Sequence, residues 1–405
     1  MTKIRILAIP SDKHGVGKFR MMDPYQFIGD NHSDDIHVDI TYNADNNDEY
    51  FLNYDIVVFH TFIHQTNHEQ NIGRIKWLQS KGIKVIMDID DLWFVDQRHP
   101  MYHQVKASKI GEMKIDMLKA VDYVTTTTSI FAKTIKDKLH IKNIEIFPNA
   151  VNEDEPQFKR EPIKSDKIRF GWLGGSSHLK DIQLLDGTFN KLSQHKDKFE
   201  IYLCGFDVRG SVTEINKQTG EQNVRPIKPE ETVWYQYEKV FTNNYQYDTP
   251  EYKEFLMKFK EEEYTGGDYV RYNRIWTRPV TSYAKNYAKF DVSLAPIKNH
   301  MFNRVKSQLK VIEAGFYKKA IIASNVGPYT IDLKHCLQNG NFVDGNAFLV
   351  DESRNHSDWF KYAKKLIDNP NWAHDLGERL YETVKDTYDL NVVTKTRAEF
   401  YKSIV

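Results

Sequence analysis

The chain has 405 residues, of which 56 are Lys or Arg and 56 are Asp or Glu, so its formal net charge is zero. This balance makes nucleic acid an unlikely main partner, because nucleic-acid-binding proteins normally carry a basic excess or stripe. The two cysteines, Cys204 and Cys336, match neither a disulfide framework nor a metal-binding spacing, which fits a reducing cytosol. A chain of this length predicts two domains.

The N-terminus enters an apolar run at once and lacks the layout of a signal peptide. No apolar stretch approaches the roughly 20 residues that span a bilayer. We therefore expect a cytoplasmic protein, and peripheral contact with the inner face of a membrane stays open. The oligomeric state also stays open.

Short apolar runs rich in β-branched residues alternate with segments of helical period along the chain. Near-continuous apolar runs indicate parallel strands covered on both faces, and their alternation with helices predicts a doubly wound sheet. The first half contains the predicted strands Ile4–Ile9, Ile36–Ile40, Ile56–Phe59, Ile83–Met87, Tyr123–Thr126 and Ile144–Phe147. The second half contains Ile168–Leu173, Glu200–Cys204, Asp291–Ala295, Ala320–Ala323 and Ala347–Val350.

This strand pattern restarts once, after a polar stretch at 152–167 that contains two prolines and is the best linker candidate. We therefore predict two Rossmann-like α/β domains, residues 1–160 and 161–380, that face a central cleft. A helix at 381–405 is expected to pack back toward the first domain.

The stretch 206–280 is rich in Tyr and Trp and interrupts the pattern of the second domain. We predict an aromatic-rich insertion here. Packing is the commoner use of large aromatic rings, although a lid or an acceptor platform stays open.

A glycine-containing turn follows the first predicted strand, in SDKHGVGKFR. Gly15 and Gly17 allow the backbone to approach a ligand closely, and Lys18 and Arg20 add positive charge at a probable helix start. A lone GxG is weak evidence, and a simple strand-to-helix turn is the alternative. Because this turn follows the first strand of a doubly wound sheet, anion binding and a simple strand-to-helix turn are about equally plausible.

The second predicted domain opens in the same way, with GWLGGSSHLKD. Gly174 and Gly175 form the turn, and His178 and Lys180 point toward whatever lies above the strand end. A capping or solvated residue is the alternative for His178. Two glycine turns that face one cleft indicate a ligand site more specifically than either turn alone.

Three acids follow the predicted strand Ile83–Met87, in MDIDDLWF. Asp88, Asp90 and Asp91 could bind a hard cation, orient sugar hydroxyls or act as a general base. Helix capping is the alternative, but the repulsion among three acids favours a functional role. His60, at the end of another strand, is of a kind that is more often structural.

The segment FNRVKSQLKVIEAG predicts a helix with charged groups on one face. Lys306 and Ser307 stand near its start, where free N–H groups attract anions. Glu313 follows two helical turns later on the same face. A nucleotide, with phosphate at one end and hydroxyls at the other, suits this arrangement, and a solvated charge pair is the alternative.

The motifs of several other enzyme classes do not occur in the sequence. There is no G-x-S-x-G, GxxxxGK[ST], HExxH or paired CxxC, which weakens the hydrolase, P-loop and zinc-enzyme hypotheses. The first turn also lacks the full dinucleotide fingerprint, which weakens the dehydrogenase hypothesis.

Taken in order, the motifs resemble those of a group 1 glycosyltransferase of the GT-B type, the family 4 kind common in bacterial polysaccharide biosynthesis. The resemblance spans nearly the whole chain and is strongest in DVSLAPI, FNRVKSQLKVIEAG and SNVGPY. HGVGKFR, DIDDLW, YVTTTTSIFAKTI, FPNAVN and GWLGGSSHLKD support it. The order of these motifs decides it, since no single motif does.

The resemblance implies transfer of a sugar, with retention, from a nucleotide sugar in the second domain to a hydroxyl acceptor in the first. UDP- or GDP-sugars are the expected donors, a glycan or lipid-linked molecule is the expected acceptor, and no metal is required. Glu313 would hold the ribose, and Lys180 and Gly17 would lie near the diphosphate. The two glycine turns, with Lys18 and His178, would complete the site of the donor diphosphate together with Lys306 and Ser307.

The sequence departs from the family pattern at the residues that address the sugar and the acceptor. Val305 stands where the family has its sugar-facing glutamate, so Asn303 or Lys306 is expected to contact the sugar. The acids Asp88, Asp90 and Asp91 replace a catalytic-region histidine, and they are expected to orient the acceptor hydroxyl or accept its proton. A nucleotide-sugar epimerase of the same build and a non-catalytic binding module remain alternatives.

Overall fold

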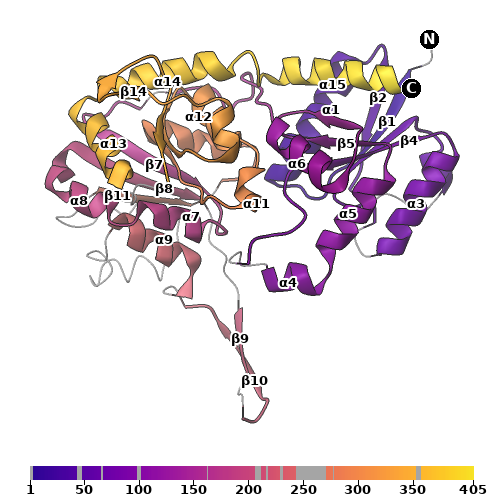
Figure 1. Cartoon of the computed structure of the whole chain (residues 1–405), viewed down its shortest axis with the longest axis horizontal. Coiled ribbons are helices and arrows are strands. Elements are labelled where there is room, and N and C mark those ends of the chain that lie inside the picture. Colours follow the sequence, from indigo (N-terminus) through magenta and orange to yellow (C-terminus); the bar gives the residue numbers. More distant parts are fainter. Residues whose placement is uncertain are drawn as a thin grey trace.

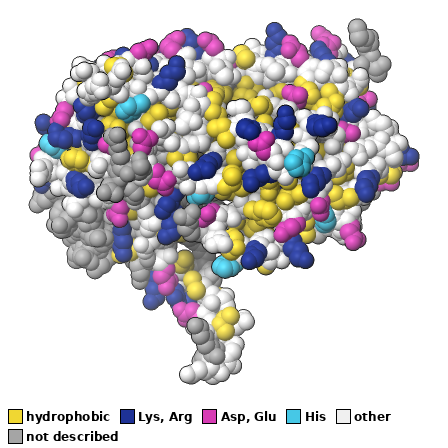
Figure 2. Space-filling model, viewed as in Figure 1, with side chains coloured by type: hydrophobic (Ala, Val, Ile, Leu, Met, Phe, Trp, Pro, Cys, Tyr) yellow, Lys and Arg dark blue, Asp and Glu magenta, His cyan; other side chains and the backbone are white. Residues whose placement is uncertain are grey.

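The computed structural model describes residues 3–42, 48–64, 67–97, 102–161, 163–205, 211–215, 218–228, 231–242, 271–276, 278–352 and 357–405. The chain forms two α/β domains that lie side by side, and two helices near the C-terminus run along one edge of both (Figure 1). On the face in Figure 2, basic and acidic side chains are interspersed, as the balanced charge suggests.

The first domain contains a six-stranded parallel sheet in the order β2-β1-β3-β4-β5-β6. Its strands are β1 (Ile4–Ile9), β2 (Ile36–Ile40), β3 (Ile56–His60), β4 (Lys84–Ile89), β5 (Tyr123–Thr126) and β6 (Ile144–Ile146). Its helices are α1 (Asp23–Asn31), α2 (Asp48–Phe51), α3 (His68–Ser80), α4 (Tyr102–Ala107), α5 (Ile110–Ala120) and α6 (Ser129–Leu139). The central strand β3 is buried throughout, as a sheet covered on both faces requires.

The second domain has a parallel sheet in the order β11-β8-β7-β12-β13-β16. Its strands are β7 (Ile168–Gly174), β8 (Phe199–Gly205), β11 (Arg271–Trp276), β12 (Val292–Ala295), β13 (Ala320–Ser324) and β16 (Phe348–Val350). Its helices include α7 (Leu179–Ile182), α8 (Thr188–Lys191), α9 (Val233–Thr242), α11 (Met301–Arg304), α12 (Leu309–Phe316) and α13 (Ser357–Asp368). A short β14 (Leu337–Gln338) pairs with β15 (Asn341–Phe342).

The predicted fold class, two doubly wound α/β domains, is confirmed, and every predicted strand is present with bounds shifted by at most a few residues. One sheet strand, β11, was missed. It lies in the stretch predicted as an insertion, which supplies α9 and the edge strand β11 to the domain itself. The hairpin of β9 (Ser211–Ile215) and β10 (Gln222–Pro226) projects from the domain (Figure 1).

Aromatic side chains of α9 pack into the core of the second domain. Trp234 and Tyr237 are buried, and their rings lie 6.1 and 5.4 Å from the ring of Trp172 on β7. These side chains therefore serve packing. Residues 243–270, which hold many of the other aromatic side chains of the stretch, lie outside the described residues.

The chain crosses between the domains twice at one place. The amide of Val151 donates to the carbonyl of Tyr388, and the amide of Leu390 donates to the carbonyl of Val151, both at 2.9 Å. Helix α14 (Asn371–Val384) packs against α12 of the second domain, whereas α15 (Leu390–Ile404) packs against α1 of the first. Two adjacent crossings form a natural hinge.

The two domains also touch through apolar side chains beside the cleft. Phe302 and Val305 belong to the second domain by sequence, yet they lie in the hydrophobic cluster of the first domain, together with Leu92 and Trp93. Val305 is fully buried. The position that holds a glutamate in the family pattern therefore makes an apolar contact between the domains.

Candidate functional site

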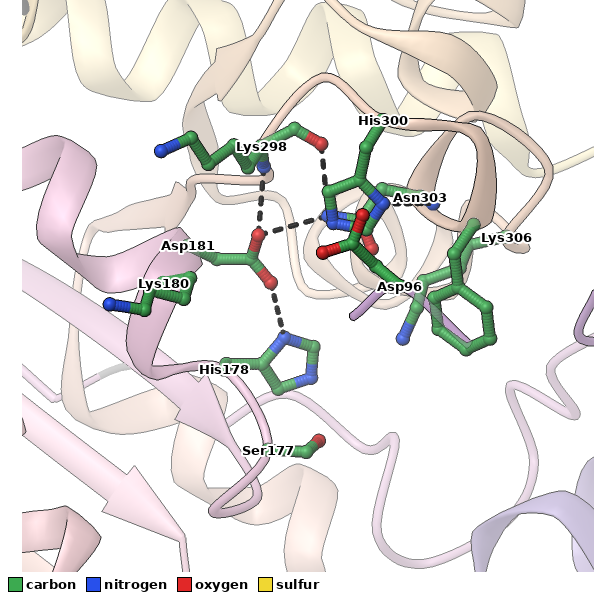
Figure 3. A pocket seen from close by; sticks show the side chains of 10 residues that line it. Asp96, Ser177, His178, Lys180, Asp181, Lys298, His300, Asn303 and Lys306 are labelled. Carbon is green, nitrogen blue, oxygen red and sulfur yellow. Dashed lines mark hydrogen bonds and ion pairs between the residues drawn. The ribbon is translucent and has the colours of Figure 1, made fainter. Parts of the chain in front are cut away.

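The order of strands in the second sheet places a crevice beyond β7 and β12. The chain leaves β7 toward one side of the sheet and leaves β12 toward the other, so the two loops diverge at this switch point. A small cavity of about 40 Å³ lies there, and Asp96 of the first domain closes one side of it (Figure 3).

Asp181, which the sequence analysis did not single out, organises the loops of this crevice. Its Oδ1 accepts hydrogen bonds from the amide of Lys298 at 2.8 Å and from Nδ2 of Asn303 at 2.9 Å. Its Oδ2 lies 2.9 Å from Nδ1 of His178 (Figure 3). Burial works against the charge, but the His178 hydrogen bond and nearby cations lower the pKa of Asp181. The ionised carboxylate thus ties the β7 loop to the β12 loop.

His178 has a hydrogen-bonding character suited to a hydroxyl group. Burial lowers the pKa of His178 to about 4, so the ring is neutral at pH 7. Because Asp181 is ionised, Nδ1 carries the hydrogen and Nε2 is left as an acceptor. A phosphate oxygen also accepts hydrogen bonds and does not donate them, so it cannot pair with this acceptor. His178 therefore fits a sugar hydroxyl better than the diphosphate that we predicted for it.

Asn303 is arranged in a similar way. Its Nδ2 donates to Asp181 and to the carbonyl of Lys298 at 3.0 Å. Both amide hydrogens are used, which leaves Oδ1 as an acceptor toward the cavity that Asn303 lines. Its expected contact with a sugar hydroxyl stays a prediction that this geometry favours.

Three lysines line the cavity, namely Lys180, Lys298 and Lys306. Lys306 extends toward the space beside Asp96, and its Nζ lies 5.0 Å from the centroid of the Phe302 ring (Figure 3). Lys180 extends away from that space in the same view. Of the predicted phosphate ligands, Lys306 is the better placed in this closed arrangement.

Lys310, another residue that the sequence analysis missed, lies under the turn at Gly174. Its ammonium donates to the carbonyl of Leu173 and lies 5.1 Å from the centroid of the Trp172 ring. A Cβ at position 174 would stand 3.1 Å from its Nζ, so the glycine leaves that approach open. Among the described residues, no carboxylate forms an ion pair with it.

The environment of Lys310 disfavours its charge. Burial lowers the pKa of Lys310 to about 8, because Glu313 compensates only in part and Lys306 adds repulsion. Lys310 is partly buried and has no ion-pair partner among the described residues, so an anion that binds at this turn would offset the cost of desolvating its charge.

The loop after β7 is held from α9. The hydroxyl of Tyr237 accepts from the amide of His178 at 2.7 Å and donates to the carbonyl of Gly175 at 3.1 Å. This double hydrogen bond fixes the predicted glycine turn. Tyr237, which belongs to the aromatic stretch, therefore holds the backbone of the site in place.

Glu313 is buried, and both of its oxygens are occupied. The hydroxyls of Tyr283 and Tyr287 donate to Oε1 and Oε2, the second at 2.9 Å. Burial raises the pKa of Glu313, and these hydrogen bonds and Lys310 oppose the shift. A ribose hydroxyl would have to share these oxygens with the tyrosine hydroxyls or displace one of them, so the ribose role stays a prediction.

Ser307 joins the two domains. Its Oγ accepts a hydrogen bond from Nδ2 of Asn149 at 3.1 Å, next to the hinge. Asn149 also accepts from the guanidinium of Arg20 at 3.3 Å. The expected contact of Ser307 with phosphate is untested, and its present partner is the hinge.

Across the cleft, Asp88 does not fill its predicted catalytic role. It is fully buried at the end of β4, where Arg20 donates to both of its oxygens at 2.9 and 2.6 Å and Thr125 donates at 2.6 Å. Every carboxylate oxygen is thus saturated inside the domain. Asp88 holds Arg20 in place and has no access to a substrate.

The other two acids lie nearer the cleft. Asp90 lies 3.0 Å from Nε2 of His60. Burial opposes the charge of Asp90, but the His60 hydrogen bond together with the charges of Arg20 and Lys114 lowers its pKa to about 2. Burial raises the pKa of Asp91, with Lys306 of the second domain as the largest opposing influence. Asp91 therefore faces the donor side of the cleft.

The first glycine turn is shaped by Asp12. Its Oδ1 accepts from the amides of His14 at 2.7 Å and Gly17 at 3.2 Å. A Cβ at Gly17 would stand 1.8 Å from the carbonyl oxygen of Asp12, whereas Gly15 has nothing within 4 Å. The turn itself requires a glycine at position 17. The space next to Gly15 is empty, so a side chain at position 15 would meet no neighbouring atom.

Lys18 does not face the cleft as predicted. Its ammonium forms ion pairs with Asp23 at 2.7 Å and with Glu155 at 2.9 Å, and its side chain is 6% exposed. Two carboxylates neutralise the charge that was expected to bind phosphate. Lys18 instead fastens the first helical turn to the hinge segment.

Comparisons with known proteins agree with this architecture. No protein-family model and no curated protein matches the chain. Among solved structures, a sucrose-phosphate synthase from Thermosynechococcus elongatus superposes with a TM-score of 0.64 at 12% identity, over 99% of each chain. Anabaena HepE in complex with UDP and glucose gives 0.61 at 11% identity, over 99% of this chain and 100% of that chain.

A glycosyltransferase from Rickettsia africae ESF-5 gives a TM-score of 0.58 at 14% identity, over 100% of this chain and 99% of that chain. The chain has the GT-B fold. At these identities the likeness establishes the architecture alone. The fold explains why Asp181 and Lys306 line one cavity with Asp96, because the loops at the switch point of the second sheet open toward the first domain.

Proposed function

We propose that this chain is a glycosyltransferase that moves a sugar from a nucleoside diphosphate donor, held by the second domain, to a hydroxyl acceptor at the first. The observation that supports this best is the partly buried ammonium of Lys310, which has no ion-pair partner among the described residues and lies under Gly174 at the switch point. A diphosphate bound at this turn would supply the missing negative charge.

The same charge suits the chemistry of transfer. The bond from the anomeric carbon to the diphosphate breaks, so negative charge grows on the leaving oxygen. Cations already in place at that oxygen stabilise the transition state without rearrangement. Lys306 and Lys310 are the candidates from this chain, and the glycine turn brings backbone N–H groups close.

The sugar would lie between the two sides of the cleft. Nε2 of His178 and Oδ1 of Asn303 are acceptors for its hydroxyl groups. Asp90 and Asp91 would orient the acceptor hydroxyl. We extend the proposal to retention of configuration, to a hexosyl donor and to the family 4 polysaccharide type, as the sequence resemblance implies, with no metal required.

A UDP-sugar is the donor to test first, because HepE is described in complex with UDP and glucose. For the acceptor we propose a glycan or a lipid-linked molecule and place the enzyme in the cytoplasm or at the inner face of a membrane. No helix among the described residues is both long enough and apolar enough to cross a bilayer. Another GT-B neighbour is described with UDP-glucose and DNA, so DNA belongs among the acceptors tested.

Donor binding requires the cleft to open. The cavity holds about 40 Å³, whereas ligand sites usually measure roughly 300–1,000 Å³. The adjacent crossings at Val151 and Leu390 provide the hinge for this motion. The structure therefore corresponds to a closed form in which the site residues already converge.

The proposal is tested by a thermal-shift screen of UDP-, GDP-, ADP- and dTDP-sugars, followed by an assay of nucleotide release for each hit. A true donor raises the melting temperature with the logarithm of its concentration once that concentration exceeds Kd, and it is slowly hydrolysed. If no nucleotide or nucleotide sugar binds at millimolar concentration, the proposed function is wrong. Binding without any sugar cleavage would instead support the non-catalytic binding module.

A further inference from the structure

The first domain has its own switch point, and three side chains with acid–base chemistry meet there. In the order β2-β1-β3-β4, the chain leaves β1 toward one edge and leaves β3 toward the other. Ser11 follows β1, His60 ends β3, and Asp90 follows β4. Crevices at such points are where doubly wound sheets bind ligands.

These side chains form a continuous hydrogen-bonded row. Oγ of Ser11 lies 2.8 Å from Nδ1 of His60, and Nε2 of His60 lies 3.0 Å from Oδ1 of Asp90. His60 is only 5% exposed, whereas Ser11 is partly exposed and forms the open end of the row. We propose that Ser11, His60 and Asp90 form a proton relay that takes the proton of the acceptor hydroxyl during sugar transfer.

The protonation states follow from Asp90. Its carboxylate is ionised at pH 7, so Nε2 of His60 must carry a hydrogen that it donates. In the neutral ring, Nδ1 is then an acceptor for the hydroxyl hydrogen of Ser11. Asp90 fixes the tautomer that a base needs, as the carboxylate does in other Ser-His-Asp arrangements.

A second acceptor allows the row to hold an extra proton. Oγ of Ser11 also lies 2.9 Å from Oδ2 of Asp12. When His60 becomes an imidazolium, its Nδ1–H can donate to Ser11, whose own hydrogen can turn to Asp12. Both proton distributions therefore satisfy the same heavy-atom positions, and no side chain has to move.

The backbone next to His60 is strained. Thr61 has a φ of 69° although it is β-branched, and its Oγ1 lies 3.2 Å from Nδ1 of His60. A β-branched residue in the left-handed region is a genuine outlier, and such strain concentrates at functional sites. A purely structural contact between strand ends would not require it.

The relay step balances as follows. The acceptor oxygen bonds to the anomeric carbon as the bond from that carbon to the diphosphate oxygen breaks. The acceptor proton moves to Oγ of Ser11, and the hydrogen of Ser11 moves to Nδ1 of His60. The imidazolium is stabilised by Asp90 and later releases its proton to solvent. Ser11 touches the acceptor, whereas His60 and Asp90 act through it.

The charges around His60 favour this step. Asp90 and Asp91 of the β4 loop and the buried Asp88 act on His60 electrostatically. Arg20 neutralises Asp88, and Lys114 of α5 acts on both Asp90 and Asp91. Negative charge next to the ring stabilises the imidazolium that the relay must form.

The inference rests on the proposed function, and Ser11→Ala and His60→Gln test it with UDP-glucose as the probe. We expect both variants to lower kcat for UDP release about 10²- to 10⁴-fold, with UDP affinity unchanged by calorimetry.

A matched control is the exposed pair His68–Asp116, with 3.1 Å between Nε2 and Oδ2, which is separate from the row of Ser11, His60 and Asp90. His68→Gln should leave both kcat and UDP affinity unchanged. A wild-type kcat in both variants would overturn the relay, as would a parallel loss of UDP affinity and melting temperature, which indicates a structural role. Failure of the wild-type protein to bind any of the UDP-, GDP-, ADP- and dTDP-sugars would instead overturn the proposed function, and the relay with it. If another nucleotide sugar binds, that donor replaces UDP-glucose in the test.

Discussion

The ammonium of Lys310 contacts the ring of Trp172 and the carbonyl of Leu173, whereas a carboxylate is its usual kind of partner. It lies 5.1 Å from the centroid of the Trp172 ring and donates to the carbonyl of Leu173. Cation–ring contacts stabilise a buried charge by about 2 kcal/mol, much less than desolvation costs. The site is therefore left with unbalanced positive charge until an anion arrives.

Replacing Lys310 by Met tests this directly. The substitution keeps most of the volume and removes the charge, so UDP affinity should fall at least tenfold while thermal stability is kept or increased. Isothermal titration calorimetry and thermal denaturation measure the two quantities. Lys364→Met, at an exposed position on α13, should change neither. Unchanged UDP affinity in Lys310→Met would show that Lys310 does not contact the donor.

The depressed pKa of Lys310 predicts a pH dependence with a defined sign. The ammonium loses its proton near pH 8 in the folded protein but near pH 10.5 in the unfolded chain. Between these values the unfolded chain holds more protons, so the contribution of Lys310 to the free energy of unfolding rises with pH. Anion binding has the opposite trend, because the neutral amine attracts phosphate weakly.

We therefore expect the wild-type protein to bind UDP more tightly than Lys310→Met at pH 7, and this advantage to decrease between pH 7 and pH 9. Taking the ratio of the two affinities removes the titration of UDP itself. A ratio that stays constant over this range would mean that the side chain remains fully charged or does not contact the ligand.

Asp88 and Asp91 should separate structural from functional acids in one experiment. Asp88→Asn breaks a fully buried ion pair with Arg20 and should cost about 3–5 kcal/mol of folding free energy. Asp91→Asn should leave stability within about 1 kcal/mol while it reduces transfer. Urea denaturation and nucleotide release provide the measurements. Equal destabilisation by both changes would contradict their different placement.

The two glycines of the first turn offer a similar contrast. Gly17→Ala places a Cβ 1.8 Å from the carbonyl oxygen of Asp12 and should destabilise the fold by a few kcal/mol, since the backbone must move. Gly15→Ala meets nothing within 4 Å and should be nearly neutral. Thermal denaturation of the two variants side by side checks the expectation, which a stable Gly17→Ala protein would refute.

Glu313 can be assigned by comparing two ligands. If it binds the ribose, Glu313→Gln should weaken UDP binding while binding of inorganic pyrophosphate, which has no ribose, is unchanged. If it only anchors Tyr283 and Tyr287, the affinities for both ligands should be affected alike. Calorimetry with each ligand distinguishes the outcomes, and Tyr283→Phe shows how much of the effect passes through the tyrosine.

Sequence periodicity predicts most of this fold because buried parallel strands are nearly continuous apolar runs. β3 and β13 read as IVVFH and AIIAS and are buried along their length. β11 was missed because RYNRIW mixes polar and aromatic residues at the edge of the sheet, where one side lacks a neighbouring strand. Edge strands lack the apolar continuity on which the prediction relies.

The site was harder to predict because local patterns do not reveal pairing. Lys18 and Asp88 look like ligands in sequence, but their partners Glu155 and Arg20 lie 137 and 68 residues away. Lys310 looks like an ordinary helix lysine, and only its position under Trp172 makes it unusual. The one available signal for Asp181 was its spacing of three residues from His178 within a motif already singled out.

The apolar contact of Phe302 and Val305 with the first domain has a consequence for ligand affinity. Because this contact needs no ligand, closure is favoured in the free protein, and burying two such side chains contributes up to about 3–6 kcal/mol. Under the proposed function the donor enters only the minor open population, so its apparent Kd would equal the intrinsic value divided by the open fraction. A glutamate at position 305 would contribute to sugar binding. The valine instead stabilises the closed form and so lowers the fraction of molecules that are open to a donor at any moment.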